Sequence, residues 1–150
     1  MANTFSQIYI QTVFAVENRQ SLITPDFKED LYKYMTGIVK NQGQKLIAIN
    51  GMPDHVHILI GLKPAMALAD LVREIKADST NYVNDQKFVR GHFNWQEGYG
   101  AFSVSKSEEQ RVITYIRNQP RHHAKRSFKD EFIEFLVQNE IEYNEKYLWN

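Results

Sequence analysis

The chain has 150 residues, of which 43% are hydrophobic and 24% are charged, as in ordinary soluble globular proteins long enough to bury a core. It contains no cysteine, which excludes disulfide bonds, thiolate metal sites and a cysteine nucleophile, and which fits the cytosol. The N-terminal segment lacks a basic leader and is interrupted by Gln7 and Gln11, so we expect neither a signal peptide nor a membrane span. The formal net charge is zero, which argues against a nucleic-acid partner unless the charges are segregated.

The first half of the chain predicts a strand, a helix and a two-stranded hairpin. Thr24 followed by Pro25 is typical of a helix start, and Gly43 is typical of a helix end. The turn at residues 51–54 is short, so the strands that it joins are antiparallel. The expected elements are a strand at 5–16, a helix at 25–43, a strand at 45–50 and a strand at 55–62.

The second half predicts more helix than strand. A helix is expected at 65–84, extended segments at 93–95 and 99–104, a third helix from Ser107, and a last helix from Ser127. Ser107 with Gln110 forms a capping box, and Pro120 ends or kinks the third helix near Gln119. The order of elements predicts one α+β domain over residues 1–150, an antiparallel sheet with helices packed on one face. This layout is ferredoxin-like, or like an RNA-recognition motif.

His55 and His57 are the most informative residues of the sequence. Val56, Ile58 and Ile60 alternate on one face of their strand, so the two histidines share the other face. Their Cα atoms are then roughly 7 Å apart. Both imidazoles can therefore bind one divalent cation, and histidine is the commonest metal ligand. The alternative is that two polar side chains merely line the solvent side of a half-buried strand.

Tyr115 and Gln119 share a face of the third predicted helix, because they are four residues apart. A phenolate beside a metal can attack a phosphodiester and hold the cut strand as an ester, although its ordinary pKa of about 10 means that a metal or base must help. With two imidazoles and a carboxamide as ligands, no protein carboxylate would neutralise the ion. The alternatives are a core tyrosine and a glutamine that bonds the last carbonyls of its helix. Pro120 can rotate Gln119 away, in which case His122 or His123 would substitute.

Three motifs together resemble the HUH single-tyrosine transposases of bacterial insertion sequences. The resemblance covers nearly the whole chain, with the motifs in the right order and a length that fits a stand-alone transposase. The motifs are His55-Val56-His57, the stretch WQEGYGAFSVS at residues 95–105, and Tyr115-Ile116-Arg117-Asn118-Gln119 followed by His122-His123.

The resemblance implies a transposase that cuts and rejoins single-stranded DNA at insertion-sequence ends through a 5′-phosphotyrosine intermediate. It implies that His55, His57 and Gln119 bind Mg²⁺ or Mn²⁺ and that Tyr115 is the nucleophile. It further implies a homodimer with shared active sites, and single-stranded DNA with hairpins as the partner. The expected location is the bacterial cytoplasm, at the nucleoid when bound to DNA, with no membrane and no nucleotide cofactor.

The charges of the chain are segregated. Residues 111–129 carry six Lys or Arg and no acid, whereas an acidic segment begins at Asp130. Such a basic stripe can bind phosphates even in a neutral molecule, although an ordinary solvated helix face is the alternative. Trp95 or Tyr99 would stack on an unpaired base. The candidates for DNA contact are Lys76, Arg90, Trp95, Arg117, Arg121, Lys125 and Arg126.

Two alternative functions stay open from the sequence. One is a domesticated, hairpin-specific nickase of the same superfamily, which uses the same tyrosine chemistry in another role. The other is a non-catalytic ferredoxin-like domain that binds nucleic acid, in which the histidines only line a platform.

Overall fold

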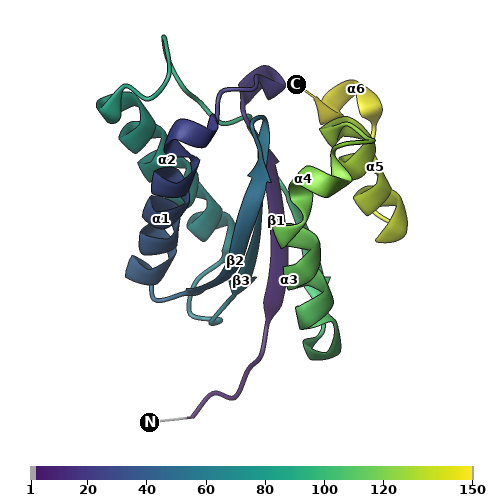
Figure 1. Ribbon diagram of the computed structural model, residues 1–150. Coiled ribbons are helices and arrows are strands. Elements are labelled where there is room, and N and C mark those ends of the chain that lie inside the picture. The colour runs from purple at the N-terminus through teal and green to yellow at the C-terminus, as the bar shows by residue number, and fades with distance from the viewer. Residues whose placement is uncertain (1–2, 150) are drawn as a thin grey trace.

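The computed structural model describes residues 3–149, which form a four-stranded antiparallel sheet with helices on both faces (Figure 1). The expected α+β class is confirmed. In space the strands follow the order β2-β3-β1-β4, so that the strand carrying the two histidines lies inside the sheet. The strands are β1 (Tyr9–Ala15), β2 (Lys45–Met52), β3 (His55–Gly61) and β4 (Gly100–Val104).

Two long helices follow the first and third strands, and a series of shorter helices follows the fourth. The long helices are α1 (Pro25–Asn41) and α2 (Leu68–Gln86). The shorter elements are η1 (Glu17–Arg19), η2 (Lys106–Glu108), α3 (Glu109–Arg117), α4 (Gln119–His122), α5 (Phe128–Gln138) and α6 (Glu145–Leu148). None of the helices in residues 3–149 has the length and apolar character needed to cross a membrane.

One face of the sheet packs against α1 and α2. Val56, Ile58 and Ile60 of β3 are fully buried on this face, as their alternation predicts. They share a core with apolar side chains of both helices, among them Leu31 and Leu71. Burying one such side chain contributes about 1.5–3 kcal/mol, and slipping β3 by one residue would expose the whole set. This core therefore fixes the register of β3 and the direction of its two histidines.

The other face is covered by α3 and α5, whereas the sequence predicted helices on one face only. Phe132 of α5 belongs to a cluster with Phe102 of β4, and Ile116 of α3 belongs to a cluster with Leu59 of β3. Both helices carry an apolar side, and packing it on the sheet removes that area from water. The imidazoles of β3 consequently lie in the interior.

Helix ends explain how the chain bends between α3 and α5. The helix predicted from Ser127 is confirmed as α5, and the Ser127 side chain caps it by accepting a 3.2 Å hydrogen bond from the Asp130 amide. The capping box at Ser107 does not form, because α3 begins only after the turn η2. Pro120 breaks the helix as predicted: α3 ends at Arg117, and Pro120 sits in the first turn of α4, where its missing N–H is not needed.

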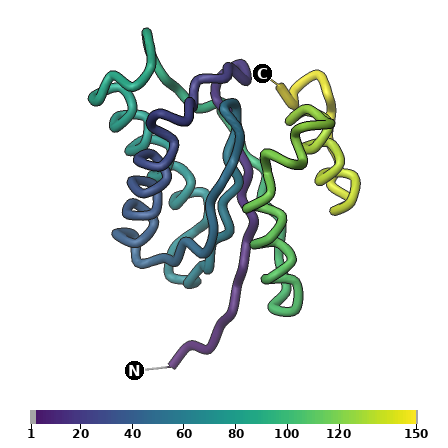
Figure 2. Tube along the Cα trace, in the orientation of Figure 1, coloured from purple at the N-terminus to yellow at the C-terminus, as the bar shows by residue number. Residues whose placement is uncertain are grey.

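The C-terminal segment lies beside η1, the short helix that follows β1. Figure 2 shows the tube of α6 approaching the segment after β1, so that residues far apart in sequence lie side by side. Arg19 donates a 3.2 Å hydrogen bond to the carbonyl of Trp149. The last helices are thus attached both to the sheet and to η1.

Candidate active site

His55 and His57 are held rigidly at the start of β3. Both are 0% exposed, which contradicts the alternative that they line the solvent side of a half-buried strand. The Nδ1 atom of His55 lies 2.7 Å from a carboxylate oxygen of Asp54, and Nδ1 of His57 lies 3.2 Å from the amide of Gln11. A partner on one ring nitrogen fixes the ring and presents the other nitrogen, which is the usual arrangement of metal-binding histidines.

A third imidazole comes from the turn after α4. His123 donates from Nδ1 to the carbonyl of Arg126 at 2.9 Å, which orients its Nε2 inward. The ring of His123 lies 4.6 Å from that of His55 between centroids. Of the two histidines that the sequence offered as substitutes for Gln119, His123 therefore joins the site. His122 instead stacks on the ring of Tyr115, with centroids 4.3 Å apart.

The carboxylate of Glu131 on α5 is the point where the three imidazoles meet. Its Oε1 lies 2.9 Å from Nε2 of His57, 2.9 Å from Nε2 of His123 and 3.4 Å from Nε2 of His55. One ligand atom from each of these four residues lies within 4.8 Å of all the others. Imidazole nitrogens and a carboxylate oxygen, buried and oriented from behind, form a donor set suited to a divalent metal ion.

The second oxygen of Glu131 faces the predicted nucleophile. Tyr115 of α3 donates a hydrogen bond to Glu131 Oε2, and Gln119 Nε2 donates to the same oxygen at 3.1 Å. Arg126 donates from Nη2 to the Tyr115 hydroxyl at 2.8 Å. One buried carboxylate thus joins the imidazole cluster, through Oε1, to the phenol, through Oε2.

Gln119 is buried and points into the site despite the proline that follows it. Its Oε1 lies 3.0 Å from Nε2 of His55. The break between α3 and α4 takes up the change of direction, so Pro120 does not rotate the carboxamide away. The four residues that the sequence placed in the catalytic and metal site, His55, His57, Tyr115 and Gln119, come together within one chain.

The electrostatics of the site favour a charged carboxylate and a neutral phenol. Burial disfavours the charged form of Glu131 and by itself would raise its pKa. Hydrogen bonds from His123, His55 and His57 outweigh this effect and hold the pKa of Glu131 well below its ordinary range. Burial and the hydrogen bond to Glu131 raise the pKa of Tyr115 above its ordinary value. Burial opposes a charged His55, but hydrogen bonds to Asp54 and Glu131 outweigh it and raise the pKa of His55 to about 9.

Glu131 was missed in the sequence, and the expectation of a site without a carboxylate is wrong. In the sequence Glu131 belongs to the acidic segment that begins at Asp130. The signal that identifies it is helical spacing: Glu131 is three residues after Phe128 and four before Phe135, on the apolar side of α5. A carboxylate on the buried face of a helix needs partners, which here are imidazoles from elements distant in sequence.

The predicted DNA-contact residues divide into four groups. Arg126 belongs to the site itself, and Lys76 donates to the carbonyls of Gln96 and Gly98. Trp95 is 4% exposed and donates from Nε1 to Ser79, so Tyr99 is the better placed ring for stacking on a base. The remaining cations have exposed side chains; they are Arg90, Arg117, Arg121 and Lys125.

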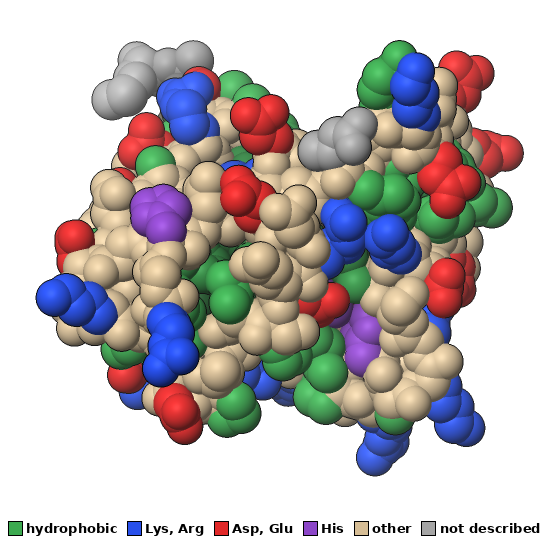
Figure 3. Space-filling model, turned by 90° about the horizontal axis from the view of Figure 1, so that it is seen from above, with side chains coloured by type: hydrophobic (Ala, Val, Ile, Leu, Met, Phe, Trp, Pro, Cys, Tyr) green, Lys and Arg blue, Asp and Glu red, His purple; other side chains and the backbone are tan. Residues whose placement is uncertain are grey.

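Basic and apolar side chains meet on one end of the molecule. Seen from above, the half built by α3 to α6 carries Lys and Arg side chains next to hydrophobic ones, with Asp and Glu side chains interspersed and a histidine visible beside them (Figure 3). The surface is notched between this half and the half built by α1 and α2 (Figure 3). Positive charge beside apolar surface is the usual character of a surface that binds single-stranded nucleic acid.

Comparison with known proteins gives a consistent result. A family described as IS200-like transposases matches residues 4–119. The chain is 25% identical over 118 residues to the ISDra2 transposase TnpA of Deinococcus radiodurans, a match that covers 75% of this chain and 84% of that protein.

Two solved structures share the fold. A candidate transposase from Deinococcus radiodurans R1 has a TM-score of 0.61 and 22% identity, over 79% of this chain and 95% of that one. A REP-associated tyrosine transposase bound to a REP hairpin has a TM-score of 0.62 and 16% identity, over 82% of this chain and 73% of that one. At these identities the two structures bear on the fold alone.

Proposed function

The chain belongs to the family of IS200-like transposases, and from this premise we propose that it cuts and rejoins single-stranded DNA through a 5′-phosphotyrosine intermediate. The observation that supports the proposal most is that Tyr115 shares one buried carboxylate, Glu131, with a cluster of three imidazoles. A stable fold does not need such a buried arrangement of ionisable groups, and such groups concentrate at catalytic sites.

We assign His55, His57 and Gln119 as ligands of Mg²⁺ or Mn²⁺, as the sequence suggested, and add His123 and Glu131. The donor set fits, because the four atoms of the His/Glu cluster converge and each imidazole is oriented through its Nδ1. A divalent ion held there would polarise the scissile phosphate and stabilise the charge that develops on it. Glu131 would neutralise part of the charge of that ion.

Tyr115 is the proposed nucleophile, and its neighbours orient its oxygen. Its oxygen forms the new bond to phosphorus while the bond from phosphorus to the 3′ oxygen breaks. Glu131 Oε2 holds the phenol in place by accepting its hydrogen bond. The phenolic proton leaves to solvent as the new bond forms, and the departing 3′ oxygen takes up a proton from solvent to become a hydroxyl. Arg126 stabilises the phenolate as it forms. Because the ester conserves the bond energy, another 3′ hydroxyl can reverse the step at a new junction without a nucleotide cofactor.

Hairpin-bearing DNA is the proposed partner. A fold relative is a REP-associated tyrosine transposase bound to a REP hairpin, which supports a hairpin ligand for this chain as well. We propose a homodimer acting at the nucleoid as the working form.

A hairpin-specific nickase is the second candidate function, supported by the same relative. Subterminal hairpins and a missing target duplication around the gene would favour a mobile element, and scattered hairpins without element ends would favour the nickase.

The experiment that tests the function is direct. The protein is incubated with labelled single-stranded DNA from both flanks of its gene and Mn²⁺, then denatured and separated by electrophoresis. We expect a covalent adduct that mass spectrometry locates on the peptide containing Tyr115. DNA binding without any adduct would favour the non-catalytic binding domain instead.

A further inference from the structure

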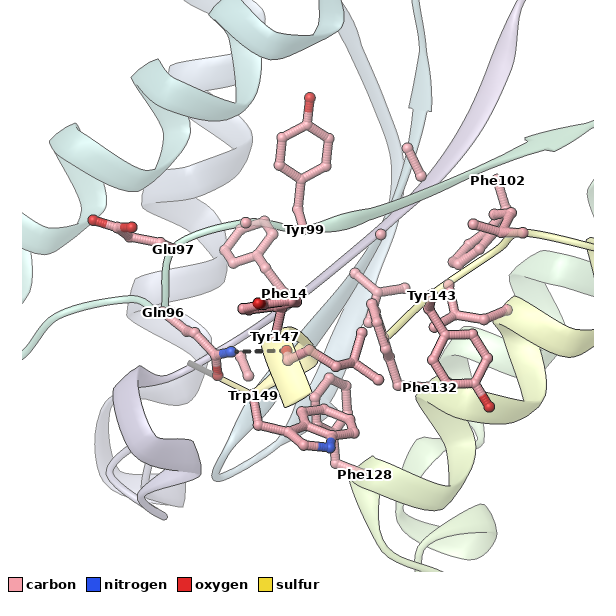
Figure 4. Close-up of a pocket in the computed structure, with 18 of the residues that line it drawn as sticks. Phe14, Gln96, Glu97, Tyr99, Phe102, Phe128, Phe132, Tyr143, Tyr147 and Trp149 are labelled. Carbon is pink, nitrogen blue, oxygen red and sulfur yellow. Dashed lines mark hydrogen bonds between the residues drawn. The ribbon is translucent and has the colours of Figure 1, made fainter. Parts of the chain in front are cut away.

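A cavity of about 450 Å³ lies between the sheet and the C-terminal helices (Figure 4). Its volume falls within the range of about 300–1,000 Å³ that is typical of small-molecule sites. Aromatic rings from separate parts of the chain line it, from the segment at β4, from α5 and from the C-terminal segment (Figure 4). The rings that carry the argument are Tyr99, Phe102, Phe128, Tyr147 and Trp149.

The cavity shares a wall with the candidate active site. The ring of Phe128 stacks on the imidazole of His55, with centroids 4.4 Å apart and planes inclined by 28°. The same Phe128 lines the cavity, where Trp149 lies 6.3 Å away between centroids. A ligand in the cavity would therefore be separated from the imidazole cluster by one aromatic ring.

Cations lie against two of the rings of this cavity without lining it themselves. Lys76 lies 5.9 Å from the ring of Tyr99. Arg19 and Lys129 lie 5.4 Å and 5.3 Å from the ring of Trp149. Aromatic rings interleaved with cations are the combination that binds single-stranded nucleic acid, because bases stack on the rings while the cations contact phosphates.

Polar groups at the edge suit the rim of a base. The side chain of Gln96 lies at the cavity, where its Nε2 donates to the carbonyl of Leu148 (Figure 4). Glu142 also lines it, and a carboxylate can accept hydrogen bonds from the exocyclic amino group of a base. The cavity thus offers flat apolar walls and a polar edge.

We propose that this cavity binds one unpaired nucleobase of the DNA strand, next to the phosphate that Tyr115 attacks. The inference rests on the proposed function, since it concerns the same substrate. Stacking in the cavity fixes the nucleotide on one side of Phe128, and the phosphate attached to it reaches the cluster on the other side. The cavity thereby sets where along the strand the cut falls.

The test removes two exposed tyrosine rings that line the cavity, because their loss should not disturb the hydrophobic core of the protein. Tyr147 is 65% exposed and Tyr99 is 39% exposed. Each is changed to Ala in a Tyr115→Phe background, so that binding is measured without cleavage. The matched control is Tyr34→Ala, because Tyr34 is 41% exposed and belongs to α1, outside the residues that line the cavity.

The probe is labelled single-stranded DNA from the flanks of the gene, with one base at a time replaced by an abasic site. In the Tyr115→Phe protein we expect one position at which the abasic site weakens binding about tenfold, as stacking contributions predict. Tyr147→Ala and Tyr99→Ala should bind the intact DNA more weakly. In these two variants an abasic site at that position should weaken binding little further. In the Tyr34→Ala control, the abasic site should weaken binding as much as it does in the Tyr115→Phe protein.

A second measurement does not depend on whether a variant folds. A 2-aminopurine placed at the sensitive position should lose fluorescence when the Tyr115→Phe protein binds, because stacking on aromatic rings quenches it. The nucleobase site would be overturned if abasic sites weakened binding equally at every position in all proteins, or if 2-aminopurine at the sensitive position were not quenched. Either result would leave the transposase function standing. If the protein bound no DNA at all, the proposed function would fail and the site with it.

Discussion

Tyr115 donates its phenolic hydrogen bond to Glu131, a residue 16 positions later on a different helix. The same carboxylate accepts from His57 and His123 through its other oxygen. The nucleophile and the imidazole cluster are consequently coupled through one side chain. A change at any of these residues should affect both metal affinity and the position of the phenol.

Replacing Tyr115 by Phe should abolish the covalent DNA adduct while keeping the fold and DNA binding. Only the hydroxyl is lost, so the change removes hydrogen bonds to Glu131 and Arg126, which costs about 1 kcal/mol of unfolding free energy for each bond. Thermal melting and adduct formation are measured together, with Tyr34→Phe as the control. An adduct retained by Tyr115→Phe would place the nucleophile elsewhere, at Tyr99 or Tyr82.

Removal of the metal should stop cleavage. EDTA should abolish the reaction of the unmodified protein. His55→Ala or His57→Ala should lower Mn²⁺ affinity more than about 100-fold, because each removes a metal ligand and not merely a residue that hydrogen-bonds a ligand. Since imidazole favours later transition metals, Mn²⁺ should support activity at least as well as Mg²⁺. Calorimetry measures the affinity, and exposed His92→Ala is the control. Full cleavage in EDTA would contradict a metal mechanism.

Glu131→Gln should weaken Mn²⁺ binding by about 10–100-fold, because it removes the negative ligand but keeps the side-chain shape. The control is Glu134→Gln on the same helix, whose carboxylate pairs with Arg126 near the surface. The rise in melting temperature on adding Mn²⁺ should shrink only in the Glu131 variant. Tighter Mn²⁺ binding by Glu131→Gln would mean that the carboxylate blocks the site instead of completing it.

Two glycines should respond in opposite directions to alanine. At Gly51 an added Cβ would lie 2.9 Å from the Cα of Val56, against the backbone of the strand that carries the histidines. Gly51→Ala should therefore lower both the melting temperature and the Mn²⁺ affinity. At Gly37, within α1, no atom lies within 4 Å of the added Cβ, so Gly37→Ala should stabilise the helix by up to about 1 kcal/mol. Unchanged metal affinity in a folded Gly51→Ala protein would contradict the link to His55.

Local patterns predicted much of the fold and half of the site. The alternation around Val56 and Ile58 placed the histidines on one face of a strand, and the spacing of Tyr115 and Gln119 placed both in the same site, although the bend between α3 and α4 separates them. These features depend on neighbours a few residues away. They are therefore readable from the sequence.

Contacts between distant segments were not readable in the same way. Glu131 meets His57 across 74 residues, and nothing in either local pattern specifies that pairing. The burial of the histidines depends on α3 and α5 packing on the second face of the sheet, which composition and periodicity leave open. Lys76 was predicted to contact phosphate, yet it also holds the carbonyls of Gln96 and Gly98, a role that only the fold defines.

The last prediction concerns whether two subunits share a site. The resemblance implied that Tyr115 acts on the histidines of a partner, but within one chain its ring already lies 6.0 Å from that of His57 between centroids. From this geometry we expect same-chain sites, so that Tyr115→Phe subunits mixed with subunits carrying both His55→Ala and His57→Ala form no adduct.

In that mixture each same-chain site keeps one defect, whereas exchanged helices would give one site with both intact halves. Subunit exchange is verified by co-purification of two different tags, and the double histidine variant mixed with unmodified protein serves as the positive control. Adduct formation in the mixture, at up to half the level of the control, would restore the shared-site arrangement. If α5 stayed on its own sheet, the hydrogen bond between Tyr115 and Glu131 would then form between subunits.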